Sequence, residues 1–375
     1  MNEVADVTII GAGVIGAAIA AKVAQESRQV YVIEKNESFG METSSRNSQV
    51  IHAGLYYPEN SLKAKTCVEG NKLLYDLCRR FAIGHRNTGK IIVAVDSFEC
   101  DALEDLLNKG RKNGVEDLRL LSRRELQSLE PNIAGVAALL SPSTGILNVH
   151  ELIKMFLNQA KELGAQVVYK SEVTGVEKDN ALYQIEVDSS GEKFLFETRV
   201  VINSAGLHAD EVARMAGIDI AGAGYTLYYC KGEYYSVSWG KSRLIDRLVY
   251  PVPPAKLTGV GVHVTLDLDG RIRLGPSAQY IDEIDYHIDD SNKRQFYAEA
   301  KKLLPFLDYD DIEPEMVGIR PKLQKPGEGQ KDFIIRHETD RGLPGLINLI
   351  GIESPGITAS PAIADIVSDM VKQIL

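Results

Sequence analysis

Three glycines and one acid near the N-terminus have the types and spacing that bind a dinucleotide. Gly11, Gly13 and Gly16 form the pattern G-x-G-x-x-G, and Glu34 follows where a ribose-binding acid is expected. Gly11 permits a tight turn, Gly13 lets a pyrophosphate approach the backbone, and Gly16 lets a helix pack closely on a strand. Glu34 can accept hydrogen bonds from a ribose diol and disfavours a 2′-phosphate, so NADP is not expected.

A polar loop follows this acid. The segment from Gly40 to Ser48 supplies hydroxyls, an amide and a cation, which suit contact with phosphates. Its polar members are Thr43, Ser44, Ser45, Arg46, Asn47 and Ser48. A plain surface loop is the alternative, but a Rossmann domain that binds a nicotinamide would normally continue here with another helical unit.

The elements that must position these residues form a strand, a helix and a second strand. Val7–Ile10 is a short apolar run, Ala17–Ala24 is rich in helix formers, and Val30–Ile33 is a buried strand that leads into Glu34. A glycine-rich turn without function is the alternative for a lone G-x-G-x-x-G. The flanking strand, helix and acid favour a nucleotide-binding unit.

A similar unit closes the chain. Leu346–Ile350 is predicted as a strand, Gly351–Gly356 as a turn and Ile357–Leu375 as an amphipathic helix. Such a helix would point the positive end of its dipole at the cofactor. We therefore expect the chain to begin and end in one nucleotide-binding domain, with a substrate domain inserted between.

Hydrophobic periodicity predicts helices and strands between these two units. The expected helices are Leu62–Ala82, Phe98–Lys112, Ser122–Leu129 (with a Ser122/Glu125 capping box), His150–Leu163 and Asp290–Leu304. The expected strands are Gly89–Val95, then Val167–Tyr169, Val173–Glu177, Leu182–Val187 and Phe194–Thr198 as a meander, and Val200–Gly206. From Gly224 to Glu315 tyrosines become frequent, and alternating runs predict the antiparallel strands of a substrate sheet.

Length and composition narrow the class of protein. The chain has 375 residues, enough for two domains, and its net charge of −10 with scattered basic residues argues against a nucleic-acid partner. The four cysteines lack C-x-x-C or zinc spacing, so we expect free thiols in a reducing compartment and no metal site. The N-terminus lacks the features of a signal peptide, and the apolar run Val7–Ala21 is too short to span a bilayer.

The segment SSRNSQVIHAGLYYPENSLKAKTCVEG resembles the FAD-dependent oxidoreductases of the D-amino-acid-oxidase superfamily. Within that superfamily it is most similar to the L-2-hydroxyglutarate dehydrogenases, also called oxidases. Its part S-x-R-N-x-x-x-x-H-x-G is also similar to anaerobic glycerol-3-phosphate dehydrogenases. The likeness to the hydroxyglutarate enzymes recurs in KGEYY, VYPVP, GVHVT, GP, GIRPKL and GIESPGITAS, so it spans nearly the whole chain.

This resemblance implies an α/β fold with a discontinuous Rossmann-like FAD-binding domain and an inserted substrate domain built on a mixed or antiparallel sheet. We expect the FAD-binding domain to comprise residues 1–88, 145–222 and 325–375, and the substrate domain residues 89–144 and 223–324. The implied cofactor is non-covalent FAD, since no cysteine is placed for a covalent link. The implied reaction oxidises L-2-hydroxyglutarate to 2-oxoglutarate.

Oxidation of a 2-hydroxy acid removes a hydride from carbon and a proton from the hydroxyl, so it needs a base and a clamp for the carboxylate. We expect His52 as the base and His263 as a substrate binder or second acid–base group; that division stays open, and a solvent-facing strand histidine is the alternative for His263. Arg320 would clamp a carboxylate, with a surface salt bridge as the alternative. Further candidates for substrate contact are Arg273, Lys322, Tyr56, Tyr57, Tyr234 and Tyr250, although each tyrosine is also a candidate for core packing.

The expected FAD contacts come from both ends of the chain. N–H groups at the turn into the last helix, at Ser354, Gly356 and Ile357, would stabilise negative charge on the reduced cofactor. The full set is Gly11, Gly13, Val14, Ile15, Gly16, Glu34, Lys35, Thr43, Ser44, Ser45, Arg46, Asn47, Ser48, Val173, Ala205, Gly206, Gly318, Ser354, Pro355, Gly356, Ile357 and Thr358. The histidines without an evident partner are His85, His150, His208, His287 and His337, and they receive no role.

Several functions and partners stay open at this point. Oxidation of glycerol 3-phosphate or of an amino acid is the first alternative, a partner-binding protein with a structural flavin is the second, and an NAD dehydrogenase is disfavoured by the polar loop. The expected partners are a small hydroxy acid and an unidentified electron acceptor, which is a quinone, a carrier protein or oxygen. We expect a cytoplasmic location, and a peripheral contact with the inner face of a membrane stays open.

Overall fold

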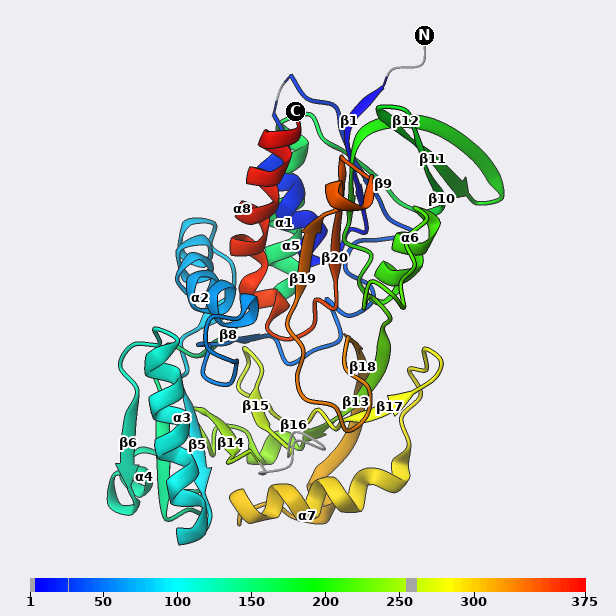
Figure 1. Ribbon diagram of the computed structural model, residues 1–375. Coiled ribbons are helices and arrows are strands. Elements are labelled where there is room, and N and C mark those ends of the chain that lie inside the picture. The colour runs from blue at the N-terminus through cyan, green and yellow to red at the C-terminus, as the bar shows by residue number, and fades with distance from the viewer. Residues whose placement is uncertain (1–3, 26, 254–261) are drawn as a thin grey trace.

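The computed structural model describes residues 4–25, 27–253 and 262–375, and it is an α/β structure with two large sheets. An eight-stranded sheet lies with helices α1, α5 and α8 in the upper half of Figure 1, and a nine-stranded sheet lies in the lower half. A three-stranded sheet of short strands is the third. Its members are β3 (Val50–Ile51), β8 (Gly145–Leu147) and β4 (His85–Arg86).

The eight-stranded sheet contains both ends of the chain. Its strands follow the order β10–β11–β12–β1–β2–β9, with β20 beside β12 and β19 beside β20. The pairs from β12 through β1 and β2 to β9 are parallel, as is β12–β20, whereas β10, β11 and β12 form an antiparallel meander. The strands are β1 (Ala5–Ile10), β2 (Val30–Ile33), β9 (Gln166–Val168), β10 (Ser171–Asp179), β11 (Leu182–Ser189), β12 (Glu192–Asn203), β19 (Ile334–His337) and β20 (Leu346–Ile350).

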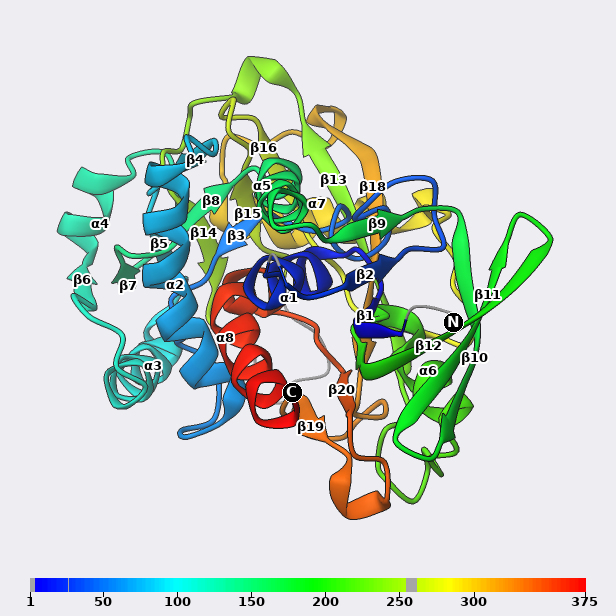
Figure 2. The ribbon, with the colours of Figure 1, turned by 90° about the horizontal axis from the view of Figure 1, so that it is seen from above.

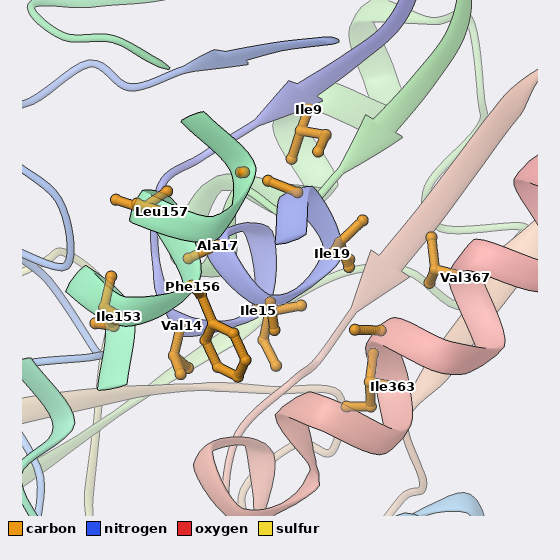
Figure 3. Packing of buried hydrophobic residues seen from close by; sticks show 14 of the residues in the cluster. Ile9, Val14, Ile15, Ala17, Ile19, Ile153, Phe156, Leu157, Ile363 and Val367 are labelled. Atoms are coloured by element: carbon orange, nitrogen blue, oxygen red, sulfur yellow. The ribbon is translucent and has the colours of Figure 1, made fainter. Parts of the chain in front are cut away.

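Three helices cover one face of this sheet, as Figure 2 shows from above: α1 (Val14–Val23), α5 (Val149–Glu162) and α8 (Gly356–Ile374). Their apolar side chains interdigitate with β1, and Figure 3 shows Ile9, Ile19 and Phe156 among them. The close approach of α1 to β1 depends on Gly16, because a Cβ there would lie 2.0 Å from the carbonyl oxygen of Gly11. Helix α6 (Ala209–Met215) packs in a separate cluster with β10, β11 and β20.

The nine-stranded sheet follows the order β17–β13–β16–β15–β14–β5–β7–β6, with β18 on β13. Helices α3 (Cys100–Lys112), α4 (Arg123–Leu129) and α7 (Lys293–Leu303) contribute apolar side chains to its core. The strands are β5 (Lys90–Ala94), β6 (Arg119–Ser122), β7 (Ala137–Ser141), β13 (Tyr228–Val237), β14 (Leu248–Pro251), β15 (Val264–Leu266), β16 (Ile272–Leu274), β17 (Gln279–Ile281) and β18 (Ile312–Lys322).

Most helix predictions are confirmed to within a few residues. Helix α2 (Leu62–Arg80) begins after Ser61, whose side chain accepts a hydrogen bond from the Ala64 N–H, and the Ser122/Glu125 capping box of α4 is present. The predicted helices that begin at Phe98 and Asp290 start instead with short 3₁₀ turns. The division into two domains at the expected boundaries stays a prediction.

One strand prediction is wrong. The predicted strands Phe194–Thr198 and Val200–Gly206 are one strand, β12, which ends at Asn203. Along one edge β12 pairs first with β11 and then with β20, so it changes neighbours without ending. The substrate sheet is mixed, one of the two expected forms, because β14 runs parallel to β5. The part of the run GVGVHVTLDL before Val262 lies outside the described residues.

Candidate active site

A long cavity runs between the two large sheets. It is lined by residues of the glycine turn, the polar loop, β13, β18 and the turn before α8. Most expected FAD contacts line it: Gly11, Gly13, Val14, Ile15, Glu34, Lys35, Thr43, Ser44, Arg46, Asn47, Ser48, Val173, Ala205, Gly206, Gly318, Ser354, Pro355, Gly356 and Ile357. Gly16, Ser45 and Thr358 are not among the lining residues.

The glycine turn has the geometry that a bound pyrophosphate needs. Gly11 has a φ of +99°, and a Cβ there would lie 2.8 Å from the carbonyl oxygen of Ser204. Helix α1 begins after Gly13, which gives it no side-chain cap. One N–H group at the start of α1 already has a partner within the protein, because Val14 N–H donates to Ser44 Oγ at 3.0 Å. Ser44 reaches this N–H because Gly13, next to Ser44 Oγ, has no side chain.

Glu34 lies at the end of β2, where its carboxylate lines the cavity. Each oxygen accepts a backbone hydrogen bond, Oε2 from Ala12 N at 2.8 Å and Oε1 from Asn36 N at 2.9 Å. Each carboxylate oxygen has more than one acceptor site, so Glu34 can still accept from a ribose diol. The fixed carboxylate of Glu34 and the glycine turn before α1, both in the cavity lining, fit an adenine dinucleotide.

The polar loop is held against β18. Thr43 Oγ1 donates to the carbonyl oxygen of Ile319 at 3.1 Å, and the Asn47 amide donates to the carbonyls of Thr43 and Ser44. Gly318 permits this contact, since a Cβ there would lie 2.1 Å from the carbonyl oxygen of Arg46. The predicted phosphate loop is therefore also a link between the two sheets.

His52 follows β3 and is fixed by its backbone. Its N–H donates to Thr358 Oγ1 on α8 at 2.9 Å, and its carbonyl accepts from Asn71 Nδ2 on α2 at 2.9 Å. Its ring Nε2 lies 3.4 Å from Ser354 Oγ at the cavity wall, and Nδ1 is buried without a hydrogen-bond partner in the described structure. Thr358 thus holds the backbone of His52 in place and does not itself line the cavity.

His263 and Tyr250 form a stack at the cavity wall. Their ring centroids are 3.7 Å apart and the rings are inclined by 9°. The alternative of a solvent-facing His263 is therefore wrong. Burial, then the charge of Lys90, lowers the pKa of His52 to about 3. Burial, followed by the charges of Lys90, His52 and Arg320, lowers the pKa of His263 well below its usual value, so both rings are neutral at pH 7.

Arg320 projects from β18 into the same part of the cavity. Its Nη2 donates to the carbonyl oxygen of Ser277. Space for the guanidinium depends on Gly232 of β13, because a Cβ there would lie 2.6 Å from Nη2. The structure thus places Arg320, His52 and His263 in the lining of one cavity, and their roles stay a prediction.

Several expected substrate contacts do not line the cavity. Arg273 makes a bidentate ion pair with Glu315 at 2.7 and 2.6 Å, and Lys322 pairs with Glu353 at 3.0 Å. These two predictions are wrong because each cation is neutralised by a nearby carboxylate. Tyr56 and Tyr57 are also absent from the lining, whereas Tyr234 and Tyr250 belong to it.

One backbone prediction at the other end of the cavity also needs correction. The N–H of Gly356 donates to the carbonyl oxygen of Glu353 at 2.6 Å. This group therefore cannot also stabilise charge on the cofactor as expected. Gly356 and the neighbouring Ile357 still line the cavity.

The sequence analysis missed three features of the site. His208, given no role, lies in the lining with Nδ1 2.9 Å from Glu211, and the Glu42 carboxylate, 3.8 Å from Nε2, raises its pKa. Gly232 was missed because its role depends on the distant Arg320. Lys90 was missed although a lysine inside the apolar strand GKIIVAV was a visible signal.

Two surveys of the described residues complete the picture. No group of three or more His, Cys, Asp or Glu side chains in the ranges given above could hold a metal ion. None of the helices in this part of the chain is long and apolar enough to cross a membrane. Cys67, Cys78, Cys100 and Cys230 are all free thiols.

Comparison with known proteins agrees with this geometry. The family model described as FAD dependent oxidoreductase matches residues 6–370. A mitochondrial L-2-hydroxyglutarate dehydrogenase of Arabidopsis thaliana is 38% identical, over 97% of this chain and 83% of the relative. A glycerol 3-phosphate dehydrogenase of Caloramator mitchellensis is 31% identical, over 98% of this chain and 74% of the relative. Among solved structures, the reduced L-α-glycerophosphate oxidase of Mycoplasma pneumoniae with FAD bound superposes with a TM-score of 0.87, at 28% identity over 99% of this chain and 95% of that one.

Proposed function

The chain belongs to the family of FAD dependent oxidoreductases, and from this premise we propose that it oxidises L-2-hydroxyglutarate to 2-oxoglutarate. FAD is the cofactor and is held non-covalently. The proposal is supported by a neutral, buried histidine beside an arginine in one cavity. That pair matches the two needs of the reaction, a base for the hydroxyl proton and a clamp for the carboxylate.

When bound, FAD supplies the acceptor for the hydride that leaves the α-carbon of the substrate. His52 Nε2 takes the hydroxyl proton, and it is free to do so because burial and the charge of Lys90 hold its pKa at about 3. The hydrogen bonds of the His52 backbone to Thr358 and Asn71 keep the ring in place. Arg320 binds the carboxylate next to the reacting carbon, and His263, stacked on Tyr250, limits the position of the hydroxyl.

The test is the variant His52→Gln, which keeps a polar side chain but removes the base. We expect kcat/KM for L-2-hydroxyglutarate to fall by about 10²- to 10⁴-fold, with the flavin content unchanged. His150→Gln is the matched control, because His150 stacks on Phe39 outside the cavity lining. Near-normal turnover by His52→Gln would remove His52 from the mechanism.

Glycerol 3-phosphate is the second candidate substrate, favoured by two of the similar proteins, a glycerol 3-phosphate dehydrogenase and an L-α-glycerophosphate oxidase. Anaerobic titration of the oxidised protein with L-2-hydroxyglutarate, D-2-hydroxyglutarate and glycerol 3-phosphate separates the candidates. Bleaching of the flavin by the L-isomer alone supports the proposal. Bleaching by glycerol 3-phosphate alone would move the function to the second candidate.

The electron acceptor and the location stay predictions. We propose a cytoplasmic enzyme that passes electrons to a quinone, a carrier protein or oxygen, with a peripheral contact at the inner face of the membrane if the acceptor is a quinone. Oxygen uptake and quinone reduction, measured with the same preparation, distinguish these acceptors. Sedimentation with vesicles tests the membrane contact.

A further inference from the structure

Lys90 is a buried cation with no ionic partner among the described residues. It is the first residue of β5, and only 1% of its surface is exposed. No carboxylate in the described ranges lies within salt-bridge distance of its ammonium group. Its polar end contacts instead the rings of Tyr56 and Tyr250, at 4.5 and 4.7 Å from their centroids. Burial of an unpaired charge is costly, so such a group needs an explanation.

The position of Lys90 relates it to the active site. Tyr250 lines the cavity and stacks on His263, so Lys90 lies one aromatic ring behind the cavity wall. Cys67, which is close enough to act on the pKa of Lys90, donates a weak hydrogen bond to the carbonyl oxygen of His52 at 3.6 Å. The charges of Lys90 and Arg320 both act on His263, so this ring lies within reach of two separate cations.

Several other cations near the cavity are neutralised or engaged by the protein itself. Glu315 pairs with Arg273, and Glu353 pairs with both Lys63 and Lys322. Arg46 lines the cavity, but its guanidinium lies over the ring of Tyr286, 4.3 Å from the centroid. Arg320 remains available for the carboxylate next to the reacting carbon. Lys90 does not line the cavity, but its charge lies directly behind the lining residue Tyr250, where it can attract a second carboxylate through the ring.

We propose that Lys90 is a specificity-determining residue that selects 2-hydroxy acids with a second, distal carboxylate. The first carboxylate lies on Arg320, the hydroxyl lies at His52, and the distal carboxylate points toward Lys90 and the tyrosine pair. This inference rests on the proposed function and extends it to substrate selection. It also gives a function to a lysine that lies in an otherwise apolar strand, since the substrate brings a negative charge to the other side of Tyr250.

The experiment compares a diacid with a monoacid on the oxidised holoenzyme. Dissociation constants for glutarate and butyrate are measured from the change in flavin absorbance, for the wild type and for Lys90→Met. We expect Lys90→Met to weaken glutarate binding by about 10- to 100-fold, the range for two unit charges about 7–10 Å apart at an effective dielectric constant of about 20, and butyrate binding by less than about threefold. An unchanged ratio of the two constants would overturn the proposal.

Two further variants exclude a general effect of the substitution. Lys293→Met is the matched control, because the Lys293 ammonium also lies over a tyrosine ring, 4.9 Å from Tyr309, but outside the cavity lining. It should leave both constants unchanged. Lys90→Arg keeps the positive charge and should keep most of the preference for glutarate over butyrate. If Lys90→Arg loses as much of this preference as Lys90→Met does, the charge has no role in selecting the substrate.

Stability provides a readout that separates a ligand-binding lysine from a structural one. A methionine fills a similar volume without a buried charge, so Lys90→Met should unfold at the same temperature as the wild type or higher. A large loss of stability would instead assign Lys90 to the fold and overturn the proposal. If Lys90→Met fails to bind FAD, the ratio of the dissociation constants for glutarate and butyrate is measured with Lys90→Gln instead. An unchanged ratio in that variant would overturn the proposal.

The same preparations separate this inference from the proposed function. Anaerobic reduction of the wild type by L-2-hydroxyglutarate tests the reaction. If only glycerol 3-phosphate reduces the flavin, the proposed function fails, whereas the glutarate-to-butyrate ratio still reports on Lys90. If L-2-hydroxyglutarate reduces the flavin but the ratio does not change in Lys90→Met, the reaction stands and the inference about Lys90 fails.

Discussion

Lys63 and Lys90 are both 1% exposed, yet their surroundings are opposite. Lys63 Nζ lies 3.0 Å from one oxygen of Glu353, and Lys322 Nζ lies 3.0 Å from the other. In the described part of the chain, the Lys90 ammonium group has two tyrosine rings and no carboxylate as neighbours. The charge of Lys63 is therefore compensated by a carboxylate of the protein. The charge of Lys90 is not compensated by any carboxylate in the described structure.

The ionisation of the two sites reflects this difference. Burial would raise the pKa of Glu353, but Lys63 and Lys322 outweigh it and lower that pKa to about 2. Burial lowers the pKa of Lys90 to about 7, and no anion in the described structure opposes it strongly. Complete ion pairs stabilise the fold around a site, while an uncompensated charge marks where a ligand is expected to bind.

The largest expected effect is on the free energy of unfolding, at the ion pairs of Glu353 with Lys63 and Lys322. Glu353→Gln should destabilise the protein by about 3–5 kcal/mol, because it leaves two buried ammonium groups without an anion. Urea denaturation of the holoenzyme measures this free energy of unfolding. Glu328→Gln is a suitable control, since that carboxylate pairs with Lys331 at the surface. A change below about 1 kcal/mol for Glu353→Gln would remove the contrast between the two lysines.

A smaller effect is expected in the pH dependence of stability. The pKa of Lys90 is about 7 in the folded protein and 10.5 in the unfolded chain, so between these values the unfolded state binds more protons. The free energy of unfolding should therefore rise with pH above 7, by at most about 1.4 kcal/mol per pH unit from this group. Denaturation at pH 7, 8 and 9 should show this slope in the wild type and in Lys293→Met. Lys90→Met should lose this slope, and an equal slope in Lys90→Met would mean that folding does not lower the pKa of Lys90.

The smallest expected effect is on His52. Because the charge of Lys90 helps to lower the pKa of His52, Lys90→Met should raise that pKa by less than about one unit. The acid limb of the kcat/KM profile should move to higher pH accordingly. L-2-Hydroxybutyrate is the substrate for this comparison, since it lacks the carboxylate proposed to need Lys90. An acid limb near pH 6.5 in the wild type would contradict a buried, neutral His52.

Hydrophobic periodicity and motif spacing predicted those elements whose structure depends on residues close together in the sequence. The strand, helix and acid from Val7 to Glu34 are visible in the sequence because periodicity and spacing are local. The wrong predictions involve distant partners. Nothing near β12 indicates that β20 takes over from β11, and nothing near β14 indicates its parallel pairing with β5.

The same limit applies to the candidate site. His52 and Arg320 were found because they lie in motifs, and their contact with one cavity followed from the resemblance. The ion pair that excludes Arg273 joins it to Glu315, which lies on another strand. Lys90 acquires meaning only from Tyr56 and Tyr250, which come from other parts of the chain. Whether a lysine or arginine has a carboxylate partner depends on the tertiary structure. The sequence alone therefore could not show which of these side chains are ion-paired.

The packing of α8 on α1 has a consequence for synthesis on the ribosome. Ile15 and Ile19 of α1 share one core with Ile363 and Val367 of α8 (Figure 3), yet nearly the whole chain is translated between them. At roughly 5–20 residues per second, the first helix waits many seconds for its partner. Until then its apolar face is a site for chaperones or for aggregation. Chains whose translation stalls before α8 should therefore leave the apolar face of α1 exposed, because the side chains that cover it have not been made.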